Sequence, residues 1–170
     1  MQFETLTDVY KEQIEDLYSA ESQLVDALPR VAAAASDPKL REALEQHLEE
    51  TRGHVRRLTA VFGELGIAGT HSQKCKGMEG LLAEGEEILG MPGSGPAKDA
   101  AIIAAAQRVE HYEIAAYGTA KTLAGELGYD DAKGLLDETL DEESAADKLL
   151  TKIATGGLLR SGLNADANQN

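Results

Sequence analysis

The stretch GIAGTHSQKCKGMEGLLAEGEEILGMPGSGP, residues 66–96, decides the fold because it separates two pairs of long helical patterns. In each pattern apolar residues recur three and four positions apart, the spacing of a helix that buries one face. The four patterns cover residues 5–34, 38–65, 97–127 and 130–154. Only a tight turn joins the two helices of each pair, so each pair is expected to form an antiparallel hairpin.

The segment between the pairs is too long to be a tight turn. It contains one short helical pattern, MEGLLAEGEEIL at residues 78–89, between glycine-rich stretches. Two hairpins joined by a long crossover are the ferritin-like topology and not the simple up-down-up-down bundle. The sequence therefore predicts an all-α protein with a ferritin-like four-helix bundle domain over residues 1–159. Residues 160–170 are expected to form a flexible C-terminal tail.

The composition indicates a helical protein of one domain and argues against nucleic acid and membrane as partners. The chain has 170 residues, no Trp and four prolines, which leaves room for long helices. Its net charge of −14 disfavours binding to nucleic acid or to anionic membranes. No apolar run is long enough to span a bilayer, and the N-terminus lacks a signal-peptide pattern. A single cysteine excludes an internal disulfide, so a cytoplasmic location is predicted.

Each apolar stripe is interrupted by polar side chains near the middle of its helix. In the helix over residues 38–65, for example, His54 falls on the stripe and Glu50 lies on its flank. Because the midpoints of similar helices meet at one level in a bundle, these side chains are expected to converge in the interior. The converging set is Glu21, Glu50, His54, Glu110, Glu113, Glu143 and Asp147.

Six buried carboxylates require cations. Burying even one unpaired carboxylate costs several kcal/mol, and Arg108, the one basic residue near this level, does not share the stripe. Two divalent metals would neutralise most of the charge, and carboxylate with imidazole suits iron or manganese. The known pattern in bundles is Glu from two helices and Glu-x-x-His from the other two. Here Glu50 and His54 are four residues apart, and Asp147 takes the place of the second histidine.

Four aromatic or imidazole side chains near this level have other expected roles. His47 faces inward about one turn from the predicted centre, where a hydrogen bond to a carboxylate is expected. His111 points away from the stripe, toward the surface. Tyr18 and Tyr117 each lie one turn from a predicted ligand. Core packing is the simpler account of both, and a phenol bonded to a ligand is the alternative.

The chain resembles the YciE/YciF family of ferritin-like, stress-associated proteins in five segments: LYSAESQL, HLEETRGHVRRL, KGMEGLLAEGEEIL, VEHYEIAAYGTAK and LLDETLDEESAADKLL. These segments occur in family order and extend over residues 4–157. The resemblance implies a homodimer with a rubrerythrin-like di-iron site in each bundle. It also implies that the seven converging residues named above are the metal ligands.

Three classes of function remain open at this stage. The first is a di-iron oxidoreductase or peroxidase, a stress-response protein that reacts with O2 or H2O2 and takes electrons from an external donor. Glu50 and Glu143 are then the candidates to bridge the metals, and a manganese catalase-like reaction is a variant. The second is a ferroxidase or metal-binding protein without an organic substrate. The third is a structural bundle whose charged outer faces carry the function.

Overall fold

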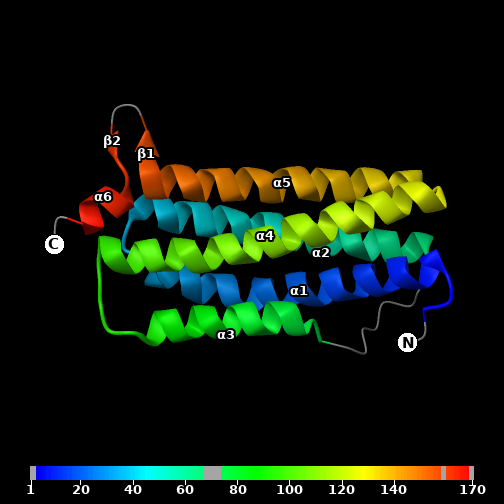
Figure 1. Cartoon of the computed structure of the whole chain (residues 1–170), viewed down its shortest axis with the longest axis horizontal. Helices are drawn as coiled ribbons and strands as arrows, with labels where there is room; N and C mark the ends of the chain where they lie inside the picture. Colours follow the sequence, from blue (N-terminus) through cyan, green and yellow to red (C-terminus); the bar gives the residue numbers. More distant parts are fainter. Residues whose placement is uncertain (1–2, 67–73, 158–159, 169–170) are drawn as a thin grey trace.

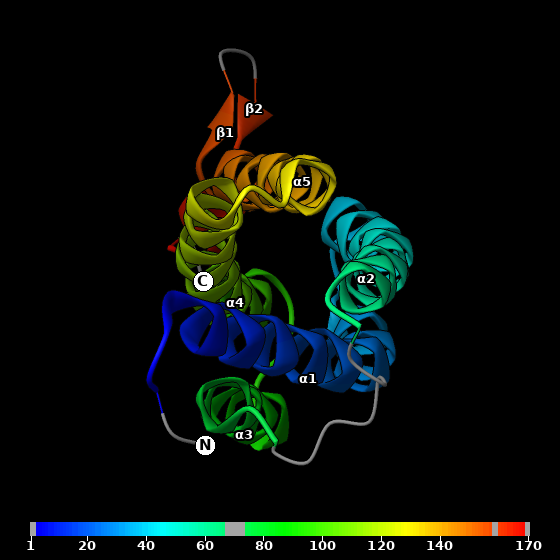
Figure 2. The same ribbon diagram turned by 90° about the vertical axis from the view of Figure 1, so that its right-hand side faces the viewer.

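Helices make up nearly all of the part of the chain that the computed structural model describes, which is residues 3–66, 74–157 and 160–168. The helices are α1 (Leu6–Ala34), α2 (Pro38–Glu64), α3 (Lys76–Gly90), α4 (Pro96–Leu127), α5 (Asp130–Thr155) and α6 (Leu163–Ala167). A short strand pair, β1 (Gly156–Gly157) and β2 (Arg160–Ser161), precedes α6 (Figure 1). The four long helices surround a common axis, and α3 lies outside them against α1 and α4 (Figure 2). The predicted ferritin-like bundle is confirmed.

The ends of the long helices lie within one residue of the predicted ends, because local capping signals fix them. At the start of α1, Thr5 and Asp8 form a reciprocal capping box. At the start of α2, the Asp37 side chain accepts hydrogen bonds from two backbone N–H groups of the first turn. Between α4 and α5, Gly128 has a φ of 77°, a left-handed conformation that favours glycine.

A buried carboxylate ties the two hairpins together at one end of the bundle. Asp99, in the first turn of α4, is 1% exposed and accepts three hydrogen bonds from the turn between α1 and α2. The donors are the Ser36 backbone N–H at 2.8 Å, the Ser36 hydroxyl at 2.5 Å and the Asp37 backbone N–H at 2.8 Å. We call this contact the Ser36–Asp99 clamp. Since α2 and α4 both begin here, the clamp aligns their first turns.

The helix of the crossover, α3, is fastened to the bundle near its first turn. Cys75 caps this helix, and its thiol Sγ lies 3.1 Å from Asp16 Oδ2 on α1 and 3.0 Å from the Tyr112 hydroxyl on α4. The Tyr112 hydroxyl in turn donates to Asp16 Oδ2 at 2.5 Å. Met78, one turn further along, is fully buried. These contacts join α3 to both α1 and α4, and the rest of α3 is only partly buried.

The interior consists of two apolar clusters with polar residues between them. One cluster includes Leu24, Leu44 and Ile102, toward the clamp, and the other includes Ile14 and Leu58, toward the opposite end. The buried polar residues outside the clamp are Glu21, His47, Thr51, His54, Glu110, Glu113, Thr139 and Glu143. They lie along the inner faces of all four long helices at the level where the sequence predicts convergence.

The C-terminal segment differs from the flexible tail expected from residue 160. β1 pairs with β2 in antiparallel fashion, and α6 follows. Leu163 at the start of α6 is only 7% exposed and belongs to the same apolar cluster as Ile103 and Ala154. Leu163 is the one large apolar residue from 160 to 170, and a single residue of this kind gives no periodic pattern to detect.

None of the described helices is both long and apolar enough to cross a bilayer. The large apolar residues that are exposed in the described part come from three separate segments: Phe3 and Leu6 near the N-terminus, Met91 after α3 and Leu149 on α5. Scattered exposed apolar residues of this kind are normal for a folded protein.

Candidate metal centre

The buried polar residues supply two adjacent groups of metal-ligand atoms. The His47 group consists of His47, Glu110, Glu113 and Glu143, and the His54 group consists of Glu21, His54 and Glu143. Within each group one ligand atom per residue lies within 4.8 Å of the others, and every member is buried. Glu143 belongs to both groups. All four long helices therefore contribute to one centre.

Helical spacing brings these side chains onto the inner faces. On α2, His47, Thr51 and His54 are four and three residues apart, so they form one stripe. The Thr51 hydroxyl donates to the His47 carbonyl at 2.8 Å, which satisfies the polar atom between the two imidazoles. On α4, Glu110 and Glu113 follow the same rule. The polar residues thus replace leucines in an otherwise regular core pattern.

The Glu143 carboxylate lies between the two imidazoles. Its Oε1 is 2.9 Å from Nδ1 of His54, and its Oε2 is 3.9 Å from Nε2 of His47. His47 Nε2 is also 3.5 Å from Glu110 Oε1, and His54 Nδ1 is 3.2 Å from Glu21 Oε1. One oxygen of Glu143 therefore faces each group, which is the arrangement of a carboxylate that bridges two cations.

Many of the potential metal-ligand atoms of this centre have no hydrogen-bond partner in the described part of the chain. They include both carboxylate oxygens of Glu113, one oxygen of Glu110 and both ring nitrogens of His47. Buried polar atoms without partners are costly, on the order of 1–3 kcal/mol each and more when charged. Coordination of cations would satisfy them. A donor set of carboxylates and imidazoles suits iron or manganese, so the residues fit the metals predicted from the sequence.

Without cations, the raised pKa values of several of these side chains keep part of the centre protonated. Burial raises the pKa of Glu110 and of Glu113 well above its ordinary value. Burial alone would lower the pKa of the two histidines, but the carboxylates around them raise it to about 9 for His47 and about 10 for His54. Burial opposes ionisation of Glu143, yet the imidazoles outweigh it and lower its pKa. Metal binding must therefore release protons.

A second carboxylate holds His54 from its other side. His54 Nε2 lies 2.9 Å from Glu142 Oε2, and the Arg57 guanidinium donates to both Glu142 oxygens, at 2.7 and 2.8 Å. Arg57 also pairs with Glu138 at 2.6 Å. A carboxylate on the outer nitrogen of a ligand histidine orients its ring. Sequence reasoning missed Glu142, although Arg57 follows His54 by three residues and Glu138 and Glu142 are four residues apart, which hints at this pairing.

The two tyrosines near the centre have different roles. The Tyr117 hydroxyl donates to Glu21 Oε1 at 2.5 Å, so this phenol is bonded to a candidate ligand. Tyr18 packs edge-on against Phe62, with ring centroids 5.5 Å apart, as core packing predicts. Burial first, and then the Glu21 charge, raises the pKa of Tyr117 well above its ordinary value. Tyr117 therefore remains a hydrogen-bond donor to Glu21.

The structure brings five of the seven predicted ligands together and adds His47 to them. Glu50 and Asp147 belong to neither group. Glu50 is partly exposed, its Oε2 lies 3.7 Å from His47 Nδ1, and its Oε1 accepts a hydrogen bond from Gln46. Asp147 Oδ1 accepts a hydrogen bond from Gln107 at 3.0 Å and lies 3.3 Å from Nε2 of the exposed His111. Among the described residues His47 makes no hydrogen bond of the kind expected of a supporting residue. Its Nε2 faces Glu110 and Glu143 in the centre, and its Nδ1 faces Glu50.

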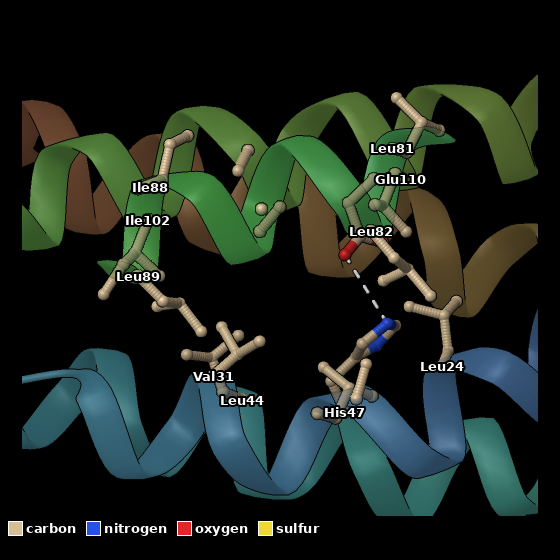
Figure 3. A pocket seen from close by; sticks show the side chains of 16 residues that line it. Leu24, Val31, Leu44, His47, Leu81, Leu82, Ile88, Leu89, Ile102 and Glu110 are labelled. Atoms are coloured by element: carbon tan, nitrogen blue, oxygen red, sulfur yellow. Dashed lines mark ion pairs between the residues drawn. The ribbon is translucent and has the colours of Figure 1, made fainter. Parts of the chain in front are cut away.

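Two pockets reach the centre, and both end at His47 and Glu110. The α2–α5 pocket, of about 130 Å³, is lined by the polar side chains of Gln46, Glu50 and Glu142 in addition to His47 and Glu110. The apolar pocket, of about 50 Å³, lies among α1, α2, α3 and α4 (Figure 3). Neither pocket is lined by Glu21 or His54. A molecule that enters either pocket therefore reaches the His47 group.

A ferritin-like four-helix bundle with a buried carboxylate–histidine centre is the class of protein that this fold and site define. The chain belongs to the family described as "Domain of unknown function (DUF892)", which it matches over residues 5–163. It is 44% identical to Protein YciF of Escherichia coli strain K12 over 164 residues, which cover 96% of this chain and 99% of YciF. The resemblance to the YciE/YciF family is confirmed.

Solved structures of relatives share the fold. The crystal structure of the E. coli stress protein YciF has a TM-score of 0.87 and 43% identity and covers 99% of this chain and 100% of that one. YcfI, a proposed structural protein from Rhodopseudomonas palustris, has a TM-score of 0.86 and 40% identity and covers 90% of this chain and 97% of its own. A Xanthomonas campestris protein with 15% identity and a TM-score of 0.70, covering 96% and 94%, shows the same fold.

Proposed function

We propose that this chain is a stress-response protein with a dinuclear metal centre, occupied by two iron ions, that reacts with O2 or H2O2. The observation that carries the proposal is the position of Glu143, whose two oxygens face two separate groups of buried donors. A single cation would leave one group unsatisfied. The similarity to the stress protein YciF supports a stress-related role.

Each residue of the centre has an assigned part. His47, Glu110 and Glu113 would hold one metal, Glu21 and His54 would hold the other, and Glu143 would contribute to both. Bound Fe(II) supplies the electrons that reduce the oxidant, and manganese on the same ligands would favour a catalase-like reaction. The apolar clusters on either side exclude bulk water.

The electron donor and the assembly are parts of the same proposal. One cysteine is too few for a rubredoxin-like site in the chain, so an external protein or small molecule supplies the electrons. A cytoplasmic location fits this single cysteine. That the protein forms a homodimer is inferred from its resemblance to the YciE/YciF family.

Ferroxidase or metal-handling activity without an organic substrate is the second candidate. The α2–α5 pocket favours it, because Glu50 and Glu142 place two carboxylates beside the path to His47. Acidic side chains that line a pocket raise the local concentration of cations. Under this function O2 or H2O2 would oxidise Fe(II) held by the same residues, and Fe(III) would leave as the product.

Metal analysis and aerobic iron addition test the proposal. Protein purified without chelator is expected to contain two metals per chain, and Fe(II) addition is expected to consume O2 or H2O2. Replacing both histidines, His47→Ala with His54→Ala, should abolish binding and consumption, whereas the exposed-histidine control His111→Ala should leave both unchanged. Iron that is oxidised and released favours the ferroxidase. Wild-type protein that binds no metal contradicts both candidates and favours the structural role proposed for YcfI.

A further inference from the structure

The apolar pocket is almost free of polar atoms except where it meets the metal centre. Of the 16 residues that line it, only His47 and Glu110 have polar side chains. Figure 3 shows these two facing each other, with leucines and isoleucines of the neighbouring helices around the remaining space. His47 Nε2 lies 3.5 Å from Glu110 Oε1 at this end. Whatever occupies the pocket therefore meets an apolar wall and then the His47 group.

The volume of the pocket limits its occupant to a very small molecule. At about 50 Å³ the pocket is far smaller than the ~150 Å³ cavity that accommodates benzene. An organic substrate is thus too large. Water and peroxide need two or more hydrogen-bond partners, which this lining offers only at His47 and Glu110. A diatomic apolar gas fits both the size and the lining.

We propose that the apolar pocket is a dioxygen site that delivers O2 to the His47 group. The proposal rests on the proposed function, in which O2 is an oxidant of the centre. The α2–α5 pocket differs in the relevant property, because Gln46, Glu50 and Glu142 offer hydrogen-bond partners to cations and peroxide. The two oxidants are therefore expected to arrive by different routes, and blocking one route should affect one oxidant.

Gly85 on α3 allows the pocket to be filled without disturbing a ligand. It lines the pocket, and a Cβ built on it has no atom within 4 Å. Gly85→Leu should therefore place its side chain in the pocket and favour the helix, because leucine has a higher helix propensity than glycine. Gly80 is the matched control. It lies on the exposed side of the same helix and also has nothing within 4 Å, and it does not line the pocket.

Xenon binding to metal-free protein tests the pocket independently of any activity. Crystals pressurised with xenon are expected to show a xenon peak in the apolar pocket of the wild type and of Gly80→Leu, and none in Gly85→Leu. Both variants should unfold at or above the wild-type Tm, which shows that they fold. No xenon in the wild-type pocket, or an equal peak in Gly85→Leu, overturns the proposal.

Stopped-flow measurements on iron-loaded protein test the delivery of O2. Gly85→Leu is expected to react with O2 about tenfold more slowly than the wild type, while its metal content and its reaction with H2O2 stay unchanged. Gly80→Leu should match the wild type in all three. If Gly85→Leu reacts with O2 at the wild-type rate, only the proposed role of the pocket is overturned. Absence of any O2 reaction in the wild type overturns the oxidant in the proposed function, and the dioxygen assignment with it.

Discussion

The two ligand groups of the centre differ in how firmly their residues are held. In the His54 group, Glu142 and Arg57 fix the outer nitrogen of the imidazole, and the Tyr117 hydroxyl fixes Glu21. In the His47 group, Glu50 is 3.7 Å from the outer imidazole nitrogen, and Glu113 has no hydrogen-bond partner among the described residues. The first group is preorganised by its neighbours, and the second is not.

This difference assigns separate tasks to the two halves. A preorganised group binds a metal in one geometry, because its ligands lose little freedom on binding. A less constrained group can change its coordination when a reactant arrives, and both pockets end at this group. We therefore expect the His54 group to anchor the centre and the His47 group to meet the oxidant.

The largest expected effect comes from removing the residue that the two halves share. Glu143→Ala deletes a ligand from both groups, so both metals should be lost and elemental analysis should find almost none. Asp147→Ala is the matched control one helical turn away, because its carboxylate is engaged by Gln107 and lies in neither group. Retention of one metal by Glu143→Ala would show that one half binds without the shared carboxylate.

The pH dependence of stability should separate metal-free from metal-loaded protein. The pKa of His47 is raised to about 9 and that of His54 to about 10, and those of Glu110 and Glu113 are also raised. A raised pKa contributes stability that is present at low pH and lost as pH rises through the folded value. The free energy of unfolding of metal-free protein should therefore fall by several kcal/mol between about pH 6.5 and pH 10.

Metal loading should remove this dependence, because the cations displace the protons and metal affinity rises with pH. Urea unfolding across this pH range, with a chelator and then with Mn(II), provides the measurement. Equal stability of the metal-free protein at both ends of the range would contradict the protonated state inferred for the centre.

A smaller effect, confined to one half, is expected when the support of His54 is removed. Arg57→Ala leaves Glu142 without its guanidinium partner, so the His54 ring is less well oriented. Loss of such support costs about 10–100-fold in metal affinity. Metal titration should show that one metal binds with lower affinity and that the other binds with unchanged affinity. Lys121→Ala removes the exposed ion pair with Asp137 and should leave both affinities unchanged.

The smallest expected effect concerns a single hydroxyl. Tyr117→Phe removes the hydrogen bond to Glu21 and should lower the free energy of unfolding by about 1–2 kcal/mol in metal-loaded protein. Tyr10→Phe is the control, because the Tyr10 hydroxyl is equally buried and has no hydrogen-bond partner in the described part of the chain. Thermal unfolding of both variants measures the difference. Equal losses of stability would mean that the bond to Glu21 contributes nothing.

The helices could be predicted from the sequence because their apolar period is regular and their ends carry proline, aspartate and glycine signals. The height along the bundle at which the buried polar residues meet could be predicted for the same reason. The rotation of each helix about its axis is less certain, since one residue corresponds to about 100°. Glu50 precedes Thr51 of the inner stripe by one position, so it lies on the flank and Thr51 and His47 face inward.

Contacts between long side chains of different helices could not be predicted. Glu142 reads as part of a solvated acidic run, and only the packing of α2 against α5 shows that Arg57 and His54 face it. Asp147 reads as a ligand one turn after Glu143, but its position on the edge of α5 faces Gln107 and His111 instead. These contacts depend on the tilt of the helices and on the length and conformation of the side chains, and the apolar periodicity of the sequence contains no information on either.

The Ser36–Asp99 clamp limits where insertions and deletions can occur among relatives of this chain. His47 follows Ser36, which lies in the turn before α2, by eleven residues, and Glu110 follows Asp99 by eleven residues along α4. Both stretches are helical over most of their length, and they bring His47 Nε2 within 3.5 Å of Glu110 Oε1. An insertion or deletion in either stretch would misalign them, whereas the connection at residues 91–95 could vary in length. Alignments of relatives should be free of gaps across 36–47 and 99–110.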